Sequence, residues 1–435
     1  MKKILIVLIV LVLSTSICFA VGQSEDVMTL TWVASGKPMA FPEWEDSEGY
    51  AGVQEKIAAQ FEKENPGVKV IVLYRDVTQG SLTVDAMMAK GEPPDVWLDA
   101  QDYFLKYLND DYALRLEEYM DTSIYFDHLI DLFTKDGHVY ALPENNVAGG
   151  FAINLDMLDQ IGYTMPAQED WTTDEFLRLS AKLKAAGIPS TMIITQNGIS
   201  AWNFPWLYAF GAEMYRNGDY SKVTINSPEA VEGLNYMKKL VDLGYAYPHP
   251  NELNEDAAVE LFTSGQVFSS MMQNGHTDYW LPQQVAQGVI EKEFNLTFVE
   301  APHAPGREHT PVFGYQTIAV GHKSDDEERN KMIAKLTAAA ASMDMQYYVC
   351  VVAGGFPTIK GFEPDEGNAA KASYKAIRKL SSIAGQMDLG DLSQHSTELY
   401  RPWKLLMHAF MDGKITAEEV LSQYEAEAIK IIGAK

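Results

Sequence analysis

The chain has 435 residues, and its 34 basic and 60 acidic side chains give a formal net charge of −26 at pH 7. This acidity repels nucleic acids and anionic lipids, so we expect no nucleic-acid partner. The two cysteines, Cys18 and Cys350, exclude a disulfide framework and a cluster of thiolate metal ligands.

The first 22 residues have the pattern of an export signal. Two lysines follow Met1, apolar residues run without a break from Ile4 to Leu13, and small or polar residues continue to Gly22. The apolar run is too short to span a bilayer as a helix, so we expect residues 1–20 to be removed and the mature protein to be periplasmic or at the cell surface. Lipid attachment at Cys18 is the alternative, which we do not favour because the bulky Ile17 stands where a small residue is required.

Signals for helices and strands alternate along the rest of the chain. Gly52 to Glu64 places apolar residues on one helical face, and a strand follows from Val68 to Leu73. A helix from Leu82 to Lys90 and a strand from Asp95 to Leu98 complete a β-α-β-α-β opening. Further helices are predicted to start after capping residues or a Ser-Pro pair at Thr172, Ser227, Asn254, Ser324 and Thr416. The alternation predicts α/β layers with largely parallel sheets.

No linker of low complexity divides the chain, so it forms either one large domain or two lobes joined by several crossings. Turn-rich residues suggest crossings at Pro143–Gly150, Thr310–Gly314 and Gly354–Pro357. We therefore expect one lobe from residues 24–143 plus 314–352, and a second from residues 144–311 plus 356–435.

Six short motifs follow one another along the mature chain. They lie in Phe61–Val70, Gly91–Val96, Gly137–Pro143, Phe151–Phe176, Leu261–Gly275 and Met411–Leu421. In this order they resemble the extracellular solute-binding proteins of carbohydrate ABC importers, family 1, the group that includes maltose-binding protein. The sequence departs from the family's motifs at two places, so the resemblance does not identify the ligand. Phe151-Ala152-Ile153 replaces the usual aromatic residue before Asn154, and His276-Thr277 follows Gly275 in place of a proline and a tryptophan.

The resemblance implies an α/β, two-lobed periplasmic-binding-protein-like fold of type II, with a multi-crossing hinge that closes around the ligand. It also implies a receptor without enzymatic activity or cofactor, which delivers a mono- or oligosaccharide to the membrane-embedded permease subunits of an ABC transporter. We expect this receptor to be a monomer.

Such a receptor needs two kinds of residue: aromatic side chains whose faces stack on sugar rings, and short polar side chains that hydrogen-bond to hydroxyl groups. Several occur beside polar residues in predicted loops or after strand ends, where ligands of open α/β sheets bind. Asp102 also lies where the resemblance places a carboxylate of the cleft, although it could equally cap a helix, and Gly275 belongs to the fifth motif. The candidate ligand-binding residues are Trp44, Asp99, Gln101, Asp102, Trp202, Trp206, Gly275, Trp280, Tyr315 and Trp403.

Motifs of enzymes are missing: the chain has no His-Glu-x-x-His, Gly-x-Ser-x-Gly, phosphate loop or Gly-x-Gly-x-x-Gly. His303 and His309 are too weak a pattern to predict a metal site, and we expect none. Asp99 and Asp102 could act in glycoside hydrolysis, which keeps a secreted carbohydrate-active enzyme open as an alternative. A receptor for a polyamine or metal chelate is a second alternative, because it would share the fold and differ in the cleft.

Overall fold

The computed structural model describes residues 27–75, 82–166, 169–196, 202–214, 222–384, 387 and 396–433. The predicted export signal at residues 1–20, including Cys18, lies outside these residues. Among the helices that are described, none combines the length and the apolar character needed to cross a membrane.

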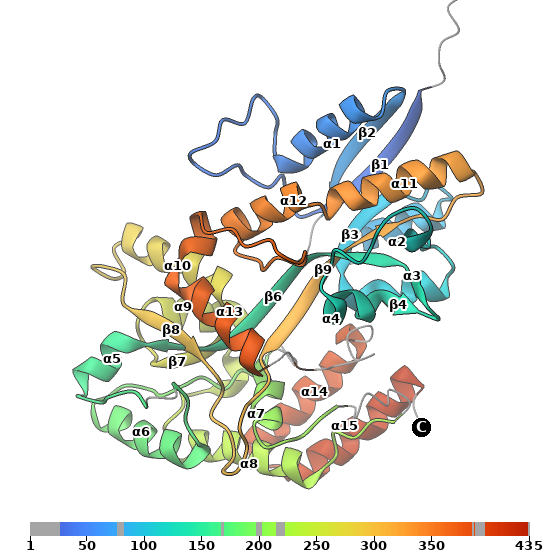
Figure 1. The fold of residues 1–435 in the computed structure, drawn as a ribbon. Helices are drawn as coiled ribbons and strands as arrows, with labels where there is room; N and C mark the ends of the chain where they lie inside the picture. The colour runs from blue at the N-terminus through green and yellow to red at the C-terminus, as the bar shows by residue number, and fades with distance from the viewer. Residues whose placement is uncertain are drawn as a thin grey trace, which may run out of the picture.

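One mixed sheet runs through both lobes, in the order β2-β1-β3-β9-β6-β7, with β8 also paired to β6 (Figure 1). The strands are β1 (Met28–Ser35), β2 (Val68–Arg75), β3 (Val96–Ala100), β6 (Ala141–Asn154), β7 (Ser269–Gln273), β8 (Leu296–Val299) and β9 (Phe313–Gly321), beside a separate hairpin of β4 (Thr134–Lys135) and β5 (His138–Val139). Among the described strands of this sheet, β1–β2 and β1–β3 are the parallel pairs, whereas β3–β9, β6–β9, β6–β7 and β6–β8 are antiparallel. The prediction of largely parallel sheets is therefore wrong for the described strands. The reason is that β6 leaves the N-terminal lobe and β9 returns to it beside β6, in the opposite direction.

The N-terminal lobe buries its strands on both faces. Leu30 and Trp32 of β1 belong to a core cluster with helices α1 and α11, whereas Val33 points to the opposite face and packs with α2 and α3. This alternation is the two-residue period of a strand. The helices of this lobe are α1 (Val53–Glu64), α2 (Leu82–Ala89), α3 (Phe104–Asn109), α4 (Asp127–Ile130), α11 (Glu327–Ala340) and α12 (Met343–Tyr348).

The C-terminal lobe has one continuous core, which gathers buried residues from Ala148 to Val312 and from Phe356 to Ala428, together with Cys350. Its helix α6 begins as predicted at a capping box, in which Thr172 and Glu175 satisfy each other's backbone N–H groups. The helices of this lobe are α5 (Leu155–Gln160), α6 (Thr173–Ala185), α7 (Phe204–Tyr208), α8 (Pro228–Asp242), α9 (Glu255–Thr263), α10 (Asn274–Ala286), α13 (Ala372–Ala384), α14 (Ser396–Met411) and α15 (Ala417–Ile432).

The predicted limits of the lobes stay a proposal, which the membership of the cores supports. Along β6 the change falls between Leu142, in the N-terminal core, and Ala148, in the C-terminal core. Along the returning chain it falls between Val312 and Ile318. Ile359, which the predicted limits assign to the second lobe, packs with the N-terminal core.

The two strands that join the lobes are continuous through the hinge (Figure 1). The first part of β6, Ala141–Gly149, pairs with β9, and its second part, Gly149–Asn154, pairs with β7 and β8. The predicted crossing at Pro143–Gly150 is thus a strand and not a turn. A third segment lies against this pair, because Phe356 exchanges backbone hydrogen bonds of 2.7 and 3.4 Å with Asn146.

A buried ion pair joins the carboxyl ends of β2 and β3. Arg75 Nη2 lies 2.7 Å from Asp99 Oδ1, and the two side chains are 5% and 1% exposed. Tyr107 Oη donates to Asp99 Oδ2 at 2.5 Å, and the backbone N–H of Ala100 donates to Oδ1 at 2.9 Å. Both carboxylate oxygens are therefore used inside the lobe.

A second buried acid lies in the hinge itself. The pairing of β6 with β9 shifts between Pro143 and Asn145, so Glu144 is the extra residue of a bulge. Its side chain is 4% exposed, and burial raises its pKa to about 8. Glu144 is therefore mainly neutral at pH 7.

We expect Asp99→Asn to lower the free energy of unfolding by about 3–5 kcal/mol, because it removes the charge of one member of a buried ion pair. Urea unfolding of the two proteins measures the loss. Asp127→Asn is the matched control, since Asp127 is 82% exposed in its ion pair with Lys360 and should cost less than about 1 kcal/mol. Equal losses in the two variants would contradict this account.

Glu144→Gln should change how stability depends on pH. Folding raises the pKa of Glu144 from 4.5 to about 8, so its contribution to stability is present below pH 4.5 and lost as the pH rises through about 8. The glutamine of the variant does not titrate, so the stability of the variant relative to wild type should increase by a few kcal/mol from about pH 5 to about pH 9. Urea unfolding over this range tests it, and a difference that is the same at every pH would refute it.

Candidate functional site

A line of side-chain amides connects the strands at the junction of the lobes. Gln101, in the single-turn helix η2 (Gln101–Tyr103) that follows β3, accepts a hydrogen bond through Oε1 from the backbone N–H of Gln316 at 3.1 Å. Gln316 Nε2, on β9, donates to Asn146 Oδ1, on β6, at 3.0 Å. Gln316 and Asn146 are both buried. We call Gln101, Asn145, Asn146 and Gln316 the hinge amides.

The third crossing closes against these amides and against α10. Asn274 Nδ2, at the start of α10, donates to the carbonyl oxygen of Gly354 at 3.0 Å. A Cβ at residue 355 would overlap the amide of Asn145, so Gly355 allows the backbone to come this close. Asn145 Oδ1 is buried and has no hydrogen-bond partner among the described residues. Buried acceptors are normally hydrogen-bonded, so this oxygen can accept a hydrogen bond from a ligand or a water molecule.

The first turns of α10 hold a second polar group. Ser373 Oγ donates to Asp278 Oδ1 at 2.6 Å, and Lys371 Nζ donates to the backbone carbonyl of Asp278 at 3.1 Å. Burial raises the pKa of Asp278 above its usual value, although the hydrogen bond from Ser373 acts in the opposite direction and lowers it.

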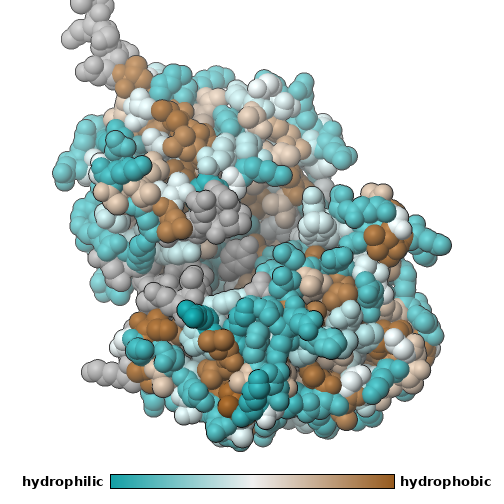
Figure 2. All heavy atoms as spheres, turned by 180° about the vertical axis from the view of Figure 1, so that it is seen from behind, coloured by the Kyte–Doolittle hydropathy of each residue, from teal (hydrophilic) through white to brown (hydrophobic). Residues whose placement is uncertain are grey.

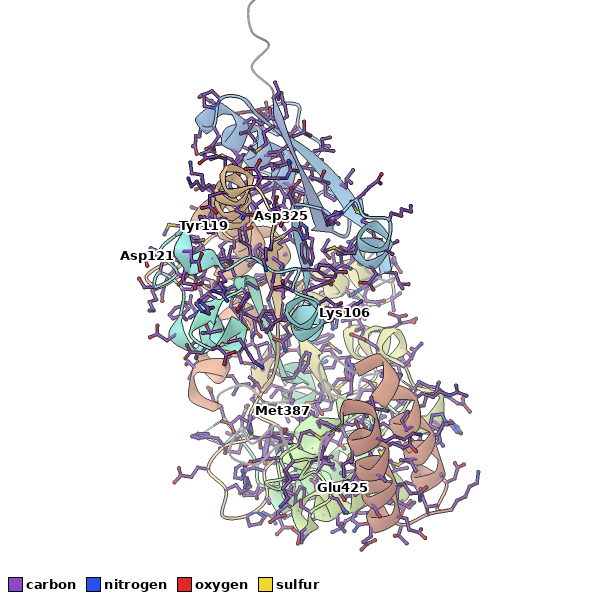
Figure 3. The ribbon with its side chains drawn as sticks, turned by 90° about the vertical axis from the view of Figure 1, so that its right-hand side faces the viewer. Lys106, Tyr119, Asp121, Asp325, Met387 and Glu425 are labelled. Carbon is purple, nitrogen blue, oxygen red and sulfur yellow. The ribbon has the colours of Figure 1, made fainter. Side chains whose placement is uncertain are left out.

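The surface is hollowed between the upper and lower lobes (Figure 2). In the side view, Lys106 of α3 lies at the lower side of the N-terminal lobe, above Met387 of the C-terminal core (Figure 3). The hinge amides come from η2, β6 and β9, which meet at this junction.

Two predicted aromatic residues are exposed. Trp44 lies in the loop between β1 and α1, 57% exposed, with its ring against Gly367 of the short helix η9 (Gly367–Ala370). Trp280 is 42% exposed and stands edge-on to Tyr279, with ring centroids 5.1 Å apart. The prediction that Trp280 lies in a loop is wrong, since it belongs to α10.

Three other predicted tryptophans are buried in the C-terminal core. Trp206 belongs to α7, is 0% exposed and meets the rings of Phe151 and Phe176, and Trp403 belongs to α14, is 2% exposed and meets Phe204 and Tyr424. These contacts lie within one lobe, so opening the hinge would not uncover them. The prediction that Trp206 and Trp403 lie in loops and stack on a ligand is therefore wrong, and Trp202 is buried in the same cluster.

The remaining candidates have mixed positions. Asp99 is enclosed by Arg75, Tyr107 and Ala100, so the prediction that it binds ligand hydroxyl groups is also wrong. Gly275 lies in the first turn of α10, facing the carbonyl of Ala353. The side chains of Asp102 and Tyr315 lie outside the described part of the structure, although their backbones belong to η2 and β9.

The sequence reasoning missed Asn145, Asn146, Gln316 and Asn274. A signal was present: the run Glu144-Asn145-Asn146 interrupts an otherwise apolar strand, and polar residues in a buried strand need partners. Pro143 and Gly149-Gly150 flank this run, however, and that composition is also typical of a turn.

The chain is similar in fold to solved receptors. ABC substrate-binding protein Lmo0181 from Listeria monocytogenes, in complex with cycloalternan, superimposes with a TM-score of 0.72 at 18% identity, covering 94% of this chain and 100% of that one. The GacH receptor of Streptomyces glaucescens, solved unliganded and with acarbose, gives 0.72 at 15% identity, over 93% and 99% of the chains. The sugar-binding protein MalE from Xanthomonas citri gives 0.73 at 15% identity, over 93% and 98%.

A sequence relative is the putative ABC transporter periplasmic-binding protein YcjN of Escherichia coli, 23% identical over 293 residues. The match covers 63% of this chain and 62% of that protein's length. The family model for bacterial extracellular solute-binding proteins matches residues 56–376, which span both lobes and all three crossings. With its two lobes and shared strands, the chain belongs to the family of bacterial extracellular solute-binding proteins.

Proposed function

We propose that this protein is the extracytoplasmic receptor of an ABC importer and that its solute is a neutral sugar, held between the lobes. The observation that carries the choice of solute is the set of hinge amides at the strands that cross from one lobe to the other. An amide both donates and accepts hydrogen bonds, as a sugar hydroxyl does. The names of the similar receptors, solved with cycloalternan and with acarbose, support the same class of solute.

The acids near the groove do not favour a cation. Asp99 is neutralised by Arg75, and Glu144 is mainly neutral at pH 7. A polyamine needs ionised carboxylates to replace its water shell, so these residues favour an uncharged solute. A metal chelate or polyamine receptor remains the alternative that ligand binding must exclude.

Binding would close the hinge. A ligand that touches both lobes binds the closed form more tightly than the open form and shifts the equilibrium toward it. We assign Gln101, Asn145, Trp44 and Trp280 to the ligand, with Gly275 at the start of α10. Asp102 and Tyr315 remain in this assignment on the sequence alone.

Export and transport complete the proposal. Residues 1–20 would be removed, Cys18 would carry no lipid, and the mature monomer would pass its ligand to the permease subunits without chemical turnover. The intact mass of the native protein tests the processing, since an acylated N-terminal Cys18 would overturn it.

Calorimetry of the purified protein against mono- and oligosaccharides, polyamines and metal chelates tests the solute class. We expect one or more sugars to bind with a dissociation constant of about 1 μM, which corresponds to a binding free energy of about 8 kcal/mol. No product should form on long incubation. X-ray scattering should show a smaller radius of gyration with ligand. Binding of a polyamine or chelate in place of every sugar would refute the sugar assignment, and released products would indicate a carbohydrate-active enzyme.

Trp44→Ala and Trp280→Ala should each weaken sugar binding by about tenfold or more, or about 1.4 kcal/mol, while the free energy of unfolding stays nearly unchanged. Both side chains are exposed, so little packing is lost. Trp206→Ala should do the opposite and destabilise the fold by about 3–5 kcal/mol. Leu405→Ala, 58% exposed on α14, is the control for removing an exposed apolar side chain. Wild-type affinity in both tryptophan variants would remove them from the site.

A further inference from the structure

A cluster of one imidazole and two carboxylates lies on the N-terminal lobe. It consists of Glu117 and Glu118, from the single-turn helix η3 (Leu116–Glu118), and of His138, from β5. One donor atom from each residue lies within 4.8 Å of the donor atoms of the other two. None of these three residues belongs to β6, β9 or η2, which carry the hinge amides.

Buried neighbours hold the two backbones that carry these donors. Leu116 is fully buried and anchors η3, and Val139 anchors β5 with 7% exposure. The β4–β5 turn contains Asp136 at φ 52° and Gly137 at φ 81°, the left-handed pair that suits a two-residue hairpin turn. His138 is therefore presented from a defined hairpin and not from a long loop.

Two of the three donors already lie within hydrogen-bond distance of each other. His138 Nδ1 lies 2.6 Å from Glu117 Oε1, and the backbone N–H of Val139 donates to Glu117 Oε2 at 2.8 Å. Glu117 is thus held at one oxygen by the imidazole and at the other by a backbone N–H group. Glu118 is not part of this pair; it lies 3.7 Å from the exposed Arg115.

We propose that Glu117, Glu118 and His138 bind a divalent metal ion of the zinc class, with water as the fourth ligand. An imidazole with two carboxylates suits Zn²⁺ and similar transition metals, whereas Ca²⁺ and Mg²⁺ prefer oxygen ligands alone. The metal replaces the proton between His138 and Glu117 and moves their two atoms apart to about 3.3 Å, the edge of a tetrahedron with bonds of about 2 Å. The Val139 N–H keeps its bond to Glu117 and orients that ligand.

Glu118 separates a metal site from a simple ion pair. The pair of Glu117 with His138 does not use Glu118, so only metal binding gives its carboxylate a role in the cluster. Glu118 is also half-exposed, so replacing it should leave the fold intact. The sequence concealed the site because its donors are about 20 residues apart and match no metal motif.

Calorimetric titration of the full, EDTA-treated protein with Zn²⁺ tests the proposal. We expect binding at this site, release of protons and a higher melting temperature with zinc. Glu118→Gln and His138→Ala should each weaken zinc binding by at least about tenfold. His128→Ala is the control, because His128 is exposed on the neighbouring α4 and should bind zinc as wild type does.

Two results would overturn the site. Wild-type protein that takes up no zinc would exclude it, and so would Glu118→Gln protein that binds zinc with wild-type affinity. Far-UV circular dichroism of each variant verifies the fold. If His138→Ala disturbs the hairpin, the zinc affinity of Glu118→Gln alone decides the test. Sugar binding does not enter this test, so its outcome is independent of the proposed receptor function.

Discussion

The pairing of β6 with β9 is the constraint on which the rest of the structure depends. Each of these strands contributes to both lobes, so neither lobe can complete its sheet without the other. Where β6 enters the C-terminal lobe the fit is tight: a Cβ at residue 149 would lie 3.1 Å from the carbonyl oxygen of Met272, and one at residue 150 would lie 2.7 Å from Ile377 Cδ1. We therefore expect any bending of β6 between Leu142 and Ala148, the last residue of the N-terminal core and the first of the C-terminal core along this strand.

Those few residues are polar. Glu144, Asn145 and Asn146 occupy the part of β6 that lies between the two cores, and Gln316 faces them from β9. Buried polar groups are costly unless they are paired, so each partner found here, from Gln316 to Phe356, compensates for loss of water. We proposed that the hinge amides bind the ligand, so in this proposal the hinge and the site share residues. Closing the hinge around a ligand then changes the surroundings of both at once.

The charge of the protein is distributed unevenly with respect to this hinge. The net charge of −26 comes from surface acids, whereas the acids buried near the hinge are paired, as Asp99 is, or mainly neutral, as Glu144 is. In a low-dielectric site an uncompensated charge would dominate recognition, because its interactions are poorly screened. The amides of the hinge offer hydrogen-bond donors and acceptors without a net charge, which is the chemistry that the proposed sugar ligand requires.

The sequence alone determined the family, the two-lobed α/β fold and several helix starts, because capping boxes, helical periodicity and ordered motifs are local patterns. The cap at Thr172 is an example, since both of its partners lie within three residues. Only the tertiary structure decided which of the candidate side chains are accessible. Trp44 and Trp206 look alike in the sequence, each beside polar or proline residues, yet one is exposed and the other is enclosed by Phe151 and Phe176. The direction of β9, the pairing of Asp99 with Arg75 and the meeting of Glu117 with His138 were likewise decided by contacts between distant residues, which no local pattern encodes.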